Sequence, residues 1–123
     1  MTQLEFIEQI IKEKEAVILD ANDKIWSYAE LPYEETRSSA LLCSILESEG
    51  FTVETGVAEI PTAFVARYVV GTGKPVMGIL GEFDALATLS QKAGCTVKDP
   101  VQNGGSGHGC GHCCLGTGAL AAA

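Results

Sequence analysis

Both histidines of this chain and three of its five cysteines lie within seven residues of one another, between His108 and Cys114. Glycines separate most of them and let the backbone bend tightly, so that their side chains can converge on one point. Imidazole and thiolate groups together suit Zn²⁺ and similar divalent ions. The alternation of His108, Cys110 and His112 therefore predicts a metal site in a glycine-rich loop.

A second group of reactive side chains comes earlier in the chain. Glu82 and Asp84 follow an apolar segment at 75–80, which predicts a strand buried on both faces. Open α/β folds place their functional sites at the C-terminal ends of such strands. These two carboxylates are therefore candidate partners of the His/Cys loop.

Helices are predicted on both sides of these groups. Apolar residues recur at helical spacing over 3–29, and Thr2 with Glu5 has the spacing of a capping box. A second helix is predicted over 34–49, with Gly50 as its C-terminal glycine. A third is expected to begin after Cys113 and to continue through the apolar residues 115–123.

Between the second and third helices the pattern becomes that of strands. Short strands are predicted at 52–55, 62–70 and 75–80, with 71–74 as a hairpin turn joining the last two. The predicted fold class is α/β: two N-terminal helices, then a mixed sheet with a β-hairpin, and a further helix at the C-terminus. The 123 residues are long enough for one domain with a modest core.

The amino-acid composition argues against several classes of function and location. Sixteen acidic and eight basic residues give a formal charge of −8, which argues against a nucleic-acid partner or an anionic membrane surface. The N-terminus is acidic, and no apolar run reaches the roughly 18 residues of a membrane span, so a cytoplasmic location is expected. The odd number of clustered cysteines favours reduced thiols over a disulfide framework.

Two motifs in order carry a family resemblance. Gly-Glu-Phe-Asp-Ala-Leu at 81–86, followed by Gly-His-Gly-Cys-Gly-His at 107–112 entering a small-residue helix, resembles the N-terminal part of the zinc-dependent aminoacylase and glutamate-carboxypeptidase family of metallopeptidases. The likeness is greatest to its amidohydrolase branch, which includes the p-aminobenzoyl-glutamate hydrolase subunits. It covers essentially the whole chain.

The resemblance implies roles for individual residues. Cys110 and His112 stand where that branch has two metal ligands, and Asp84 stands where the family has a carboxylate that supports the metal site from outside. Glu82 occupies the place of a ligand histidine in other branches and is expected, like His108, beside the ligands rather than among them. This sequence differs from that branch at one position: the residue after the ligand histidine is usually Asp or Asn there and is Cys113 here.

The implied activity is hydrolysis of an amide bond in an N-acyl amino acid, aminobenzoyl-glutamate or dipeptide-like substrate, assisted by a pair of Zn or Mn ions. The family's general-base glutamate, its remaining ligands and its lid and dimerisation domain have no counterpart in this sequence. The chain is therefore expected to be an N-terminal fragment of a catalytic domain, inactive alone and prone to self-association or homo-oligomerisation. Alone it is expected to bind metal weakly or not at all, because two ligands from one loop do not close a tetrahedral site.

Two other function classes stay open at this point. Cys110-Gly-His-Cys113 has the spacing of a thiol-disulfide redox motif. Alternatively, the cysteines and histidines could build a structural zinc site, although closed sites usually draw paired ligands from two separate turns. No role is assigned to Cys95, Cys113 or Cys114.

Overall fold

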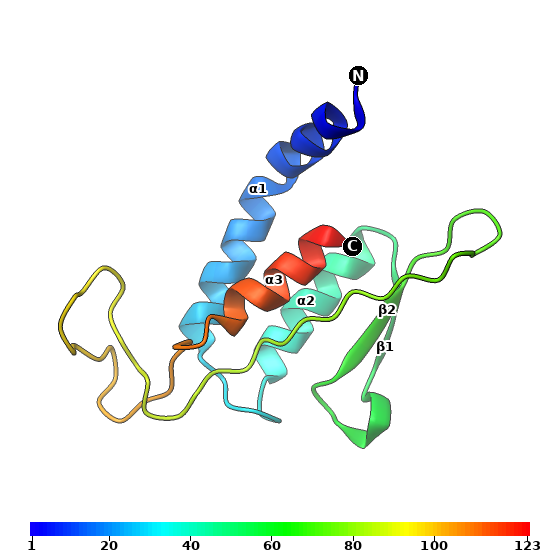
Figure 1. The fold of residues 1–123 in the computed structure, drawn as a ribbon. Coiled ribbons are helices and arrows are strands. Elements are labelled where there is room, and N and C mark those ends of the chain that lie inside the picture. Colours follow the sequence, from blue (N-terminus) through cyan, green and yellow to red (C-terminus); the bar gives the residue numbers. More distant parts are fainter.

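The computed structural model describes all of residues 1–123 and begins with a long helix, α1 (Gln3–Tyr28). The predicted capping box is confirmed: the Thr2 hydroxyl accepts the Glu5 amide proton at 3.2 Å, and the Glu5 carboxylate accepts that of Thr2 at 2.7 Å. The buried residues of α1, Ala21 and Ile25, lie in its C-terminal half, which packs on the rest of the chain (Figure 1), and Lys14 near its middle pairs with Glu49 at 2.6 Å. The N-terminal turns project outward.

The second predicted helix is α2 (Thr36–Ser48), which begins two residues later than expected. It ends as the sequence predicts, because Gly50 adopts the left-handed conformation at φ 93°. The amides of Gly50 and Phe51 donate to the carbonyls of Glu47 and Leu46, which forms a Schellman motif.

The sheet is a two-stranded antiparallel hairpin of β1 (Thr52–Thr55) and β2 (Phe64–Arg67), connected through the short 3₁₀ helix η1 (Val57–Glu59). Its register pairs Thr52 with Arg67 and Thr55 with Phe64. The first strand matches the prediction, and the second is shorter than the predicted 62–70.

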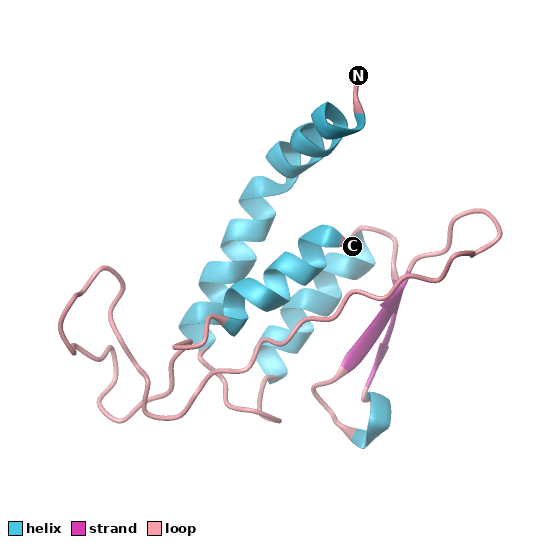
Figure 2. Cartoon of the chain, viewed as in Figure 1, coloured by secondary structure: helices cyan, strands magenta, loops and turns pink.

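The predicted third strand and the hairpin turn at 71–74 are not formed. Residues 75–80 are extended but make no ladder, and Figure 2 shows only loop from the end of β2 to the last helix. A strand needs a neighbour for its amides and carbonyls, and the apolar sequence of 75–80 does not by itself provide one.

The last helix, α3 (His112–Ala122), lies against α1 and α2. Ile25, Leu42 and Cys113 form the buried centre of the three helices, and the rings of Phe64 and Phe83 stack beside it with centroids 6.1 Å apart. The α/β fold class, with two N-terminal helices, a hairpin and a C-terminal helix, is thus confirmed. No helix combines the length and apolarity needed to cross a membrane.

A candidate metal centre

Two loops that are distant in sequence meet through a short backbone bridge. The amide of Leu86 donates to the carbonyl of Gly107, and the amide of Gly107 donates to the carbonyl of Leu86, each at 3.0 Å. A Cβ atom at Gly107 would stand 2.2 Å from the carbonyl oxygen of Leu89, so only glycine fits there. The bridge holds the segment after Asp84 beside the loop that leads to His112.

The carboxylate segment is anchored on its other side by Glu30. The amide of Ala85, which is fully buried, donates to the Glu30 carbonyl at 2.7 Å. The Glu30 carboxylate accepts the amides of Arg37 and Ser38, both at 2.9 Å, and so caps the start of α2 from outside the helix. Burial pushes the pKa of Glu30 upward, but these hydrogen bonds outweigh it and hold the pKa below its ordinary value. No sequence pattern indicates this anchor, because Glu30 is not adjacent to the helix that it caps.

Small residues then bring the carboxylates close to α3. A Cβ atom at Gly81 would lie 2.7 Å from that of Ala119, and a Cβ atom at Gly116 would lie 2.9 Å from that of Phe83. The extended segment and the helix therefore approach more closely than two chains with larger side chains could. Gly111 precedes the helix in the left-handed conformation at φ 79°. Consequently Glu82 and Asp84 lie beside the first residue of α3.

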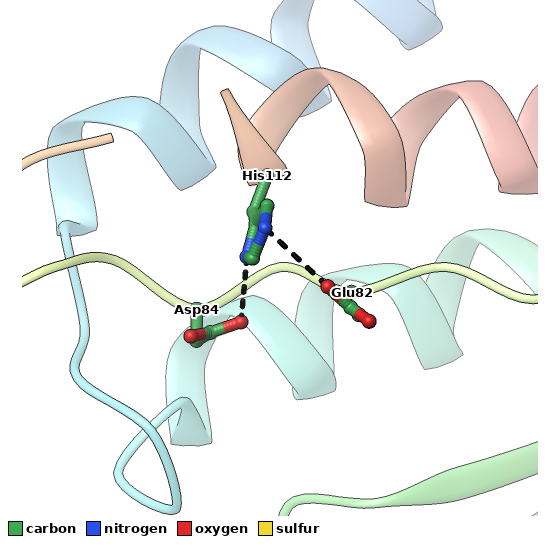
Figure 3. A group of neighbouring side chains, drawn as sticks. All are labelled: Glu82, Asp84 and His112. Atoms are coloured by element: carbon green, nitrogen blue, oxygen red, sulfur yellow. Dashed lines mark hydrogen bonds and ion pairs between the residues drawn. The ribbon is translucent and has the colours of Figure 1, made fainter. Parts of the chain in front are cut away.

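That residue is His112, and both carboxylates point toward its ring (Figure 3). Nδ1 of His112 lies 2.8 Å from Oδ1 of Asp84, and Nε2 lies 3.3 Å from Oε2 of Glu82. The side chains of His112 and Asp84 are 19% and 22% exposed, whereas that of Glu82 is 68% exposed. One end of the group is thus enclosed and the other is open to solvent.

The geometry fits a divalent ion. With Asp84 accepting the Nδ1 proton, the lone pair of His112 is on Nε2, and a carboxylate that orients a histidine in this way is a common outer partner of metal ligands. Two ligand atoms at about 2.1 Å from a tetrahedral ion stand about 3.4 Å apart. The 3.3 Å between His112 Nε2 and Glu82 Oε2 matches that separation. Glu82, Asp84 and His112 each offer a donor atom, all within 4.8 Å of one another.

The other predicted site residues lie outside this group. Cys110 precedes His112 by two residues and has an exposed thiol. His108 donates from Nε2 to the carbonyl of Ile25 at 3.0 Å, with its Nδ1 buried and unpaired, so it ties the glycine loop to α1. Burial lowers the pKa of His108 and keeps the ring neutral at pH 7. Metal ligation by Cys110 and an outer role for His108 both remain predictions.

The thiols do not assemble into a site of their own. Cys113 is buried, and its Sγ lies 3.9 Å from Sγ of its neighbour Cys114. Burial, and next the nearby Cys114, raise the pKa of Cys113 to about 11, so this thiol is not an activated nucleophile. No cysteine belongs to the group of donors that could hold an ion. This composition of the donor group disfavours a structural zinc site built from the cysteines, whereas the redox motif stays an alternative.

Comparison with known proteins gives three relatives. The chain is 50% identical over 118 residues to a p-aminobenzoyl-glutamate hydrolase subunit of Escherichia coli (strain K12), an alignment that covers 96% of this chain and 24% of that protein. It is 30% identical over 112 residues to thermostable carboxypeptidases 1 and 2 of Saccharolobus solfataricus, covering 91% of this chain and 28% of each of them.

The chain therefore spans about a quarter of the length of these relatives. No family model and no solved structure matches it. The resemblance to the amidohydrolase and carboxypeptidase family, predicted from the motifs at 81–86 and 107–112, is confirmed over nearly the whole of this chain.

Proposed function

We propose that this chain, a relative of these hydrolases and carboxypeptidases, supplies part of a metal-dependent site that hydrolyses amide bonds. The observation that carries the proposal is the pairing of His112 with both carboxylates, at 2.8 Å to Asp84 and 3.3 Å to Glu82. The motifs that form this group are also the ones that carry the family resemblance. The relatives are named for amide-bond hydrolysis, the reaction that such a site can support.

Each residue of the group has a distinct role in this proposal. Asp84 accepts the Nδ1 proton of His112, which fixes the ring orientation and leaves Nε2 to bind an ion. Glu82 lies at ligand distance beside Nε2 and is proposed as a direct ligand rather than an outer partner, with Cys110 as a further candidate. A bound Zn²⁺ or Mn²⁺ would polarise the substrate carbonyl and lower the pKa of a water molecule.

The substrate is proposed to be a small N-acyl amino acid, aminobenzoyl-glutamate or peptide-like amide. Glu82 and Asp84 line a groove of about 1440 Å³, formed with β2, α2, α3 and the extended segment, and most of the lining residues are hydrophobic. Such a groove suits an apolar acyl or aryl group next to a polar amide. A cytoplasmic location is part of the proposal, since all five cysteines are free thiols.

The isolated 123 residues are proposed to be part of a larger catalytic domain and not to turn over substrate. The group of three donors contains no additional carboxylate placed to act as general base. Ligation by His112 and Glu82 alone leaves a catalytic site short of its usual three protein ligands.

A chimera tests the function directly. The region of the E. coli p-aminobenzoyl-glutamate hydrolase protein that aligns with this chain is replaced by residues 1–123, and release of aminobenzoate is measured with the complete enzyme. The proposal predicts an active chimera that loses at least about 1000-fold in kcat/KM on His112→Ala. Cys95→Ser, at an exposed loop thiol, is the control and should keep activity. A folded His112→Ala chimera with undiminished activity would refute the proposal.

A further inference from the structure

Glu35 is a buried carboxylate in the same groove as Glu82 and Asp84. It is 9% exposed and immediately precedes α2, yet its side chain makes no capping hydrogen bond to that helix. Its Oε2 accepts the hydroxyl proton of Thr62 at 2.8 Å, and none of the ion pairs of the chain includes it. A buried carboxylate with a single hydroxyl partner is costly, so holding Thr62 does not by itself account for it.

The second oxygen of this carboxylate, Oε1 of Glu35, has no hydrogen-bond partner in the chain. The polar side-chain atoms that are enclosed without a partner are Oδ1 of Asn22 and Nδ1 of His108, so Oε1 of Glu35 is not sealed inside the protein. Because the Glu35 side chain lines the groove, this oxygen can accept a hydrogen bond from a molecule bound there.

The surroundings of Glu35 indicate what kind of molecule that is. Phe64 begins β2, two residues after Thr62, and its ring stacks with that of Phe83 in the carboxylate segment, with centroids 6.1 Å apart. Both rings line the groove. The aromatic pair therefore connects the side of the groove that has Glu35 with the side that has the candidate metal centre, and it offers a flat apolar surface to an aromatic ring.

The helices place Glu35 and the metal centre at the same end of the molecule. α2 and α3 pack side by side, and their first turns lie at the same end (Figure 1). Glu35 directly precedes α2, and His112 is the first residue of α3. A small aromatic substrate whose amide bond lies at the metal centre can thus extend its ring toward Glu35.

We propose that Glu35 recognises an aromatic amine on the acyl part of the substrate, whose amino group donates a hydrogen bond to Oε1. This inference rests on the proposed function, because it takes the groove to hold that acyl part. An ionised carboxylate only accepts hydrogen bonds, so it selects a donor. A methyl group in the same place would leave the oxygen unpaired, and a carboxylate would add a like charge.

Neutral probes test this recognition without a metal ion or turnover. In chemical-shift titrations of the 123-residue chain, 4-aminobenzamide should bind about tenfold more tightly than 4-methylbenzamide, which has the same shape and no donor at that position. Glu35→Leu should abolish the preference. Glu35→Gln, which removes only the charge, should reduce it by about threefold. Glu34→Gln, at the exposed neighbouring carboxylate, is the matched control and should keep the preference.

A further variant separates recognition from a structural role. Thr62→Val removes the internal hydrogen bond to Glu35 and keeps the carboxylate. If Glu35 only held Thr62 in place, Thr62→Val and Glu35→Leu would change probe binding equally. The proposal predicts instead that Thr62→Val keeps the preference, with circular dichroism confirming that each variant is folded.

Equal affinities of the wild type for the two probes would overturn the proposal. An unchanged preference in Glu35→Leu, or the same loss in Thr62→Val, would do so as well. These outcomes are distinct from failure of the proposed function. An inactive chimera together with a preference that depends on Glu35 would refute the proposed hydrolysis and support the recognition, whereas an active chimera together with equal probe affinities would refute the recognition alone.

Discussion

Replacing Asp84 by Asn tests whether this carboxylate prepares His112 to bind a metal ion. The variant keeps the size of the side chain and removes its charge. The amide oxygen can still accept the Nδ1 proton, so the folded structure should be retained. What changes is the strength of the hydrogen bond that now spans 2.8 Å between two largely buried side chains.

The expected loss follows from that contact. A hydrogen bond to an ionised partner contributes about 1.5 to 3 kcal/mol, and a neutral bond contributes about half as much. The lost negative charge also makes the site less favourable for a dication. Together these effects should weaken Zn²⁺ or Mn²⁺ binding by about 10- to 100-fold, or about 1.4 to 2.7 kcal/mol.

Isothermal titration calorimetry of the 123-residue chain measures this affinity. Asp99→Asn is the matched control, because it removes the same charge from an exposed ion pair with Lys92. The control should bind the ion as the wild type does. Equal affinities of the wild type and Asp84→Asn would refute the reasoning, and so would an equal loss in Asp99→Asn, which would show that only net charge matters.

Three further predictions concern stability and activity. Gly116→Ala should destabilise the chain to urea by about 1 to 3 kcal/mol, because the new methyl group meets Phe83, whereas Gly118→Ala on the same helix has open space and should stabilise it by about 0.5 to 1 kcal/mol. Equal unfolding midpoints for these two variants would contradict the close approach. Glu30→Gln should destabilise by about 1 to 2 kcal/mol at neutral pH, since it weakens the cap on α2. The folded pKa of Glu30 lies below its ordinary value of 4.5, so its contribution is present above that pH and is lost as pH falls through the lower folded value. The difference between wild type and Glu30→Gln in urea melts should therefore shrink in acid, and a constant difference would count against the cap. Finally, the isolated chain with added Zn²⁺ or Mn²⁺ should not hydrolyse aminobenzoyl-glutamate, and metal-dependent turnover in a chromatographic assay would contradict the proposal of a partial site.

The structural features that were predicted most accurately are those that depend on residues close together in the sequence. The capping box at Thr2 and the left-handed Gly50 define helix ends through contacts a few residues apart, and both are confirmed. The convergence of the carboxylate segment and the glycine loop could be predicted because two motifs in order carried a family resemblance. In the structure the two segments meet where Nδ1 of His112 lies 2.8 Å from Oδ1 of Asp84.

The features that the sequence did not predict depend on distant partners. The extended segment at 75–80 is not a strand, because pairing depends on a neighbour that its own sequence cannot supply. Glu30 caps a helix to which it does not belong and holds Ala85, and no periodicity or motif marks such a contact. Spacing places Cys110 near His112 along the chain, but in a glycine-rich loop it does not fix the direction of the thiol.

The central claim is that His112 and Glu82 hold a divalent ion with Asp84 behind the histidine. X-ray absorption spectroscopy of the chain loaded with one equivalent of Zn²⁺ tests it most directly, because nitrogen or oxygen ligands at about 2.0 to 2.1 Å differ from sulfur at about 2.3 Å. We expect one imidazole that disappears in His112→Ala, carboxylate oxygen, and no more than one sulfur, contributed by Cys110. A shell without imidazole, or one with two or more sulfur ligands, would contradict the claim.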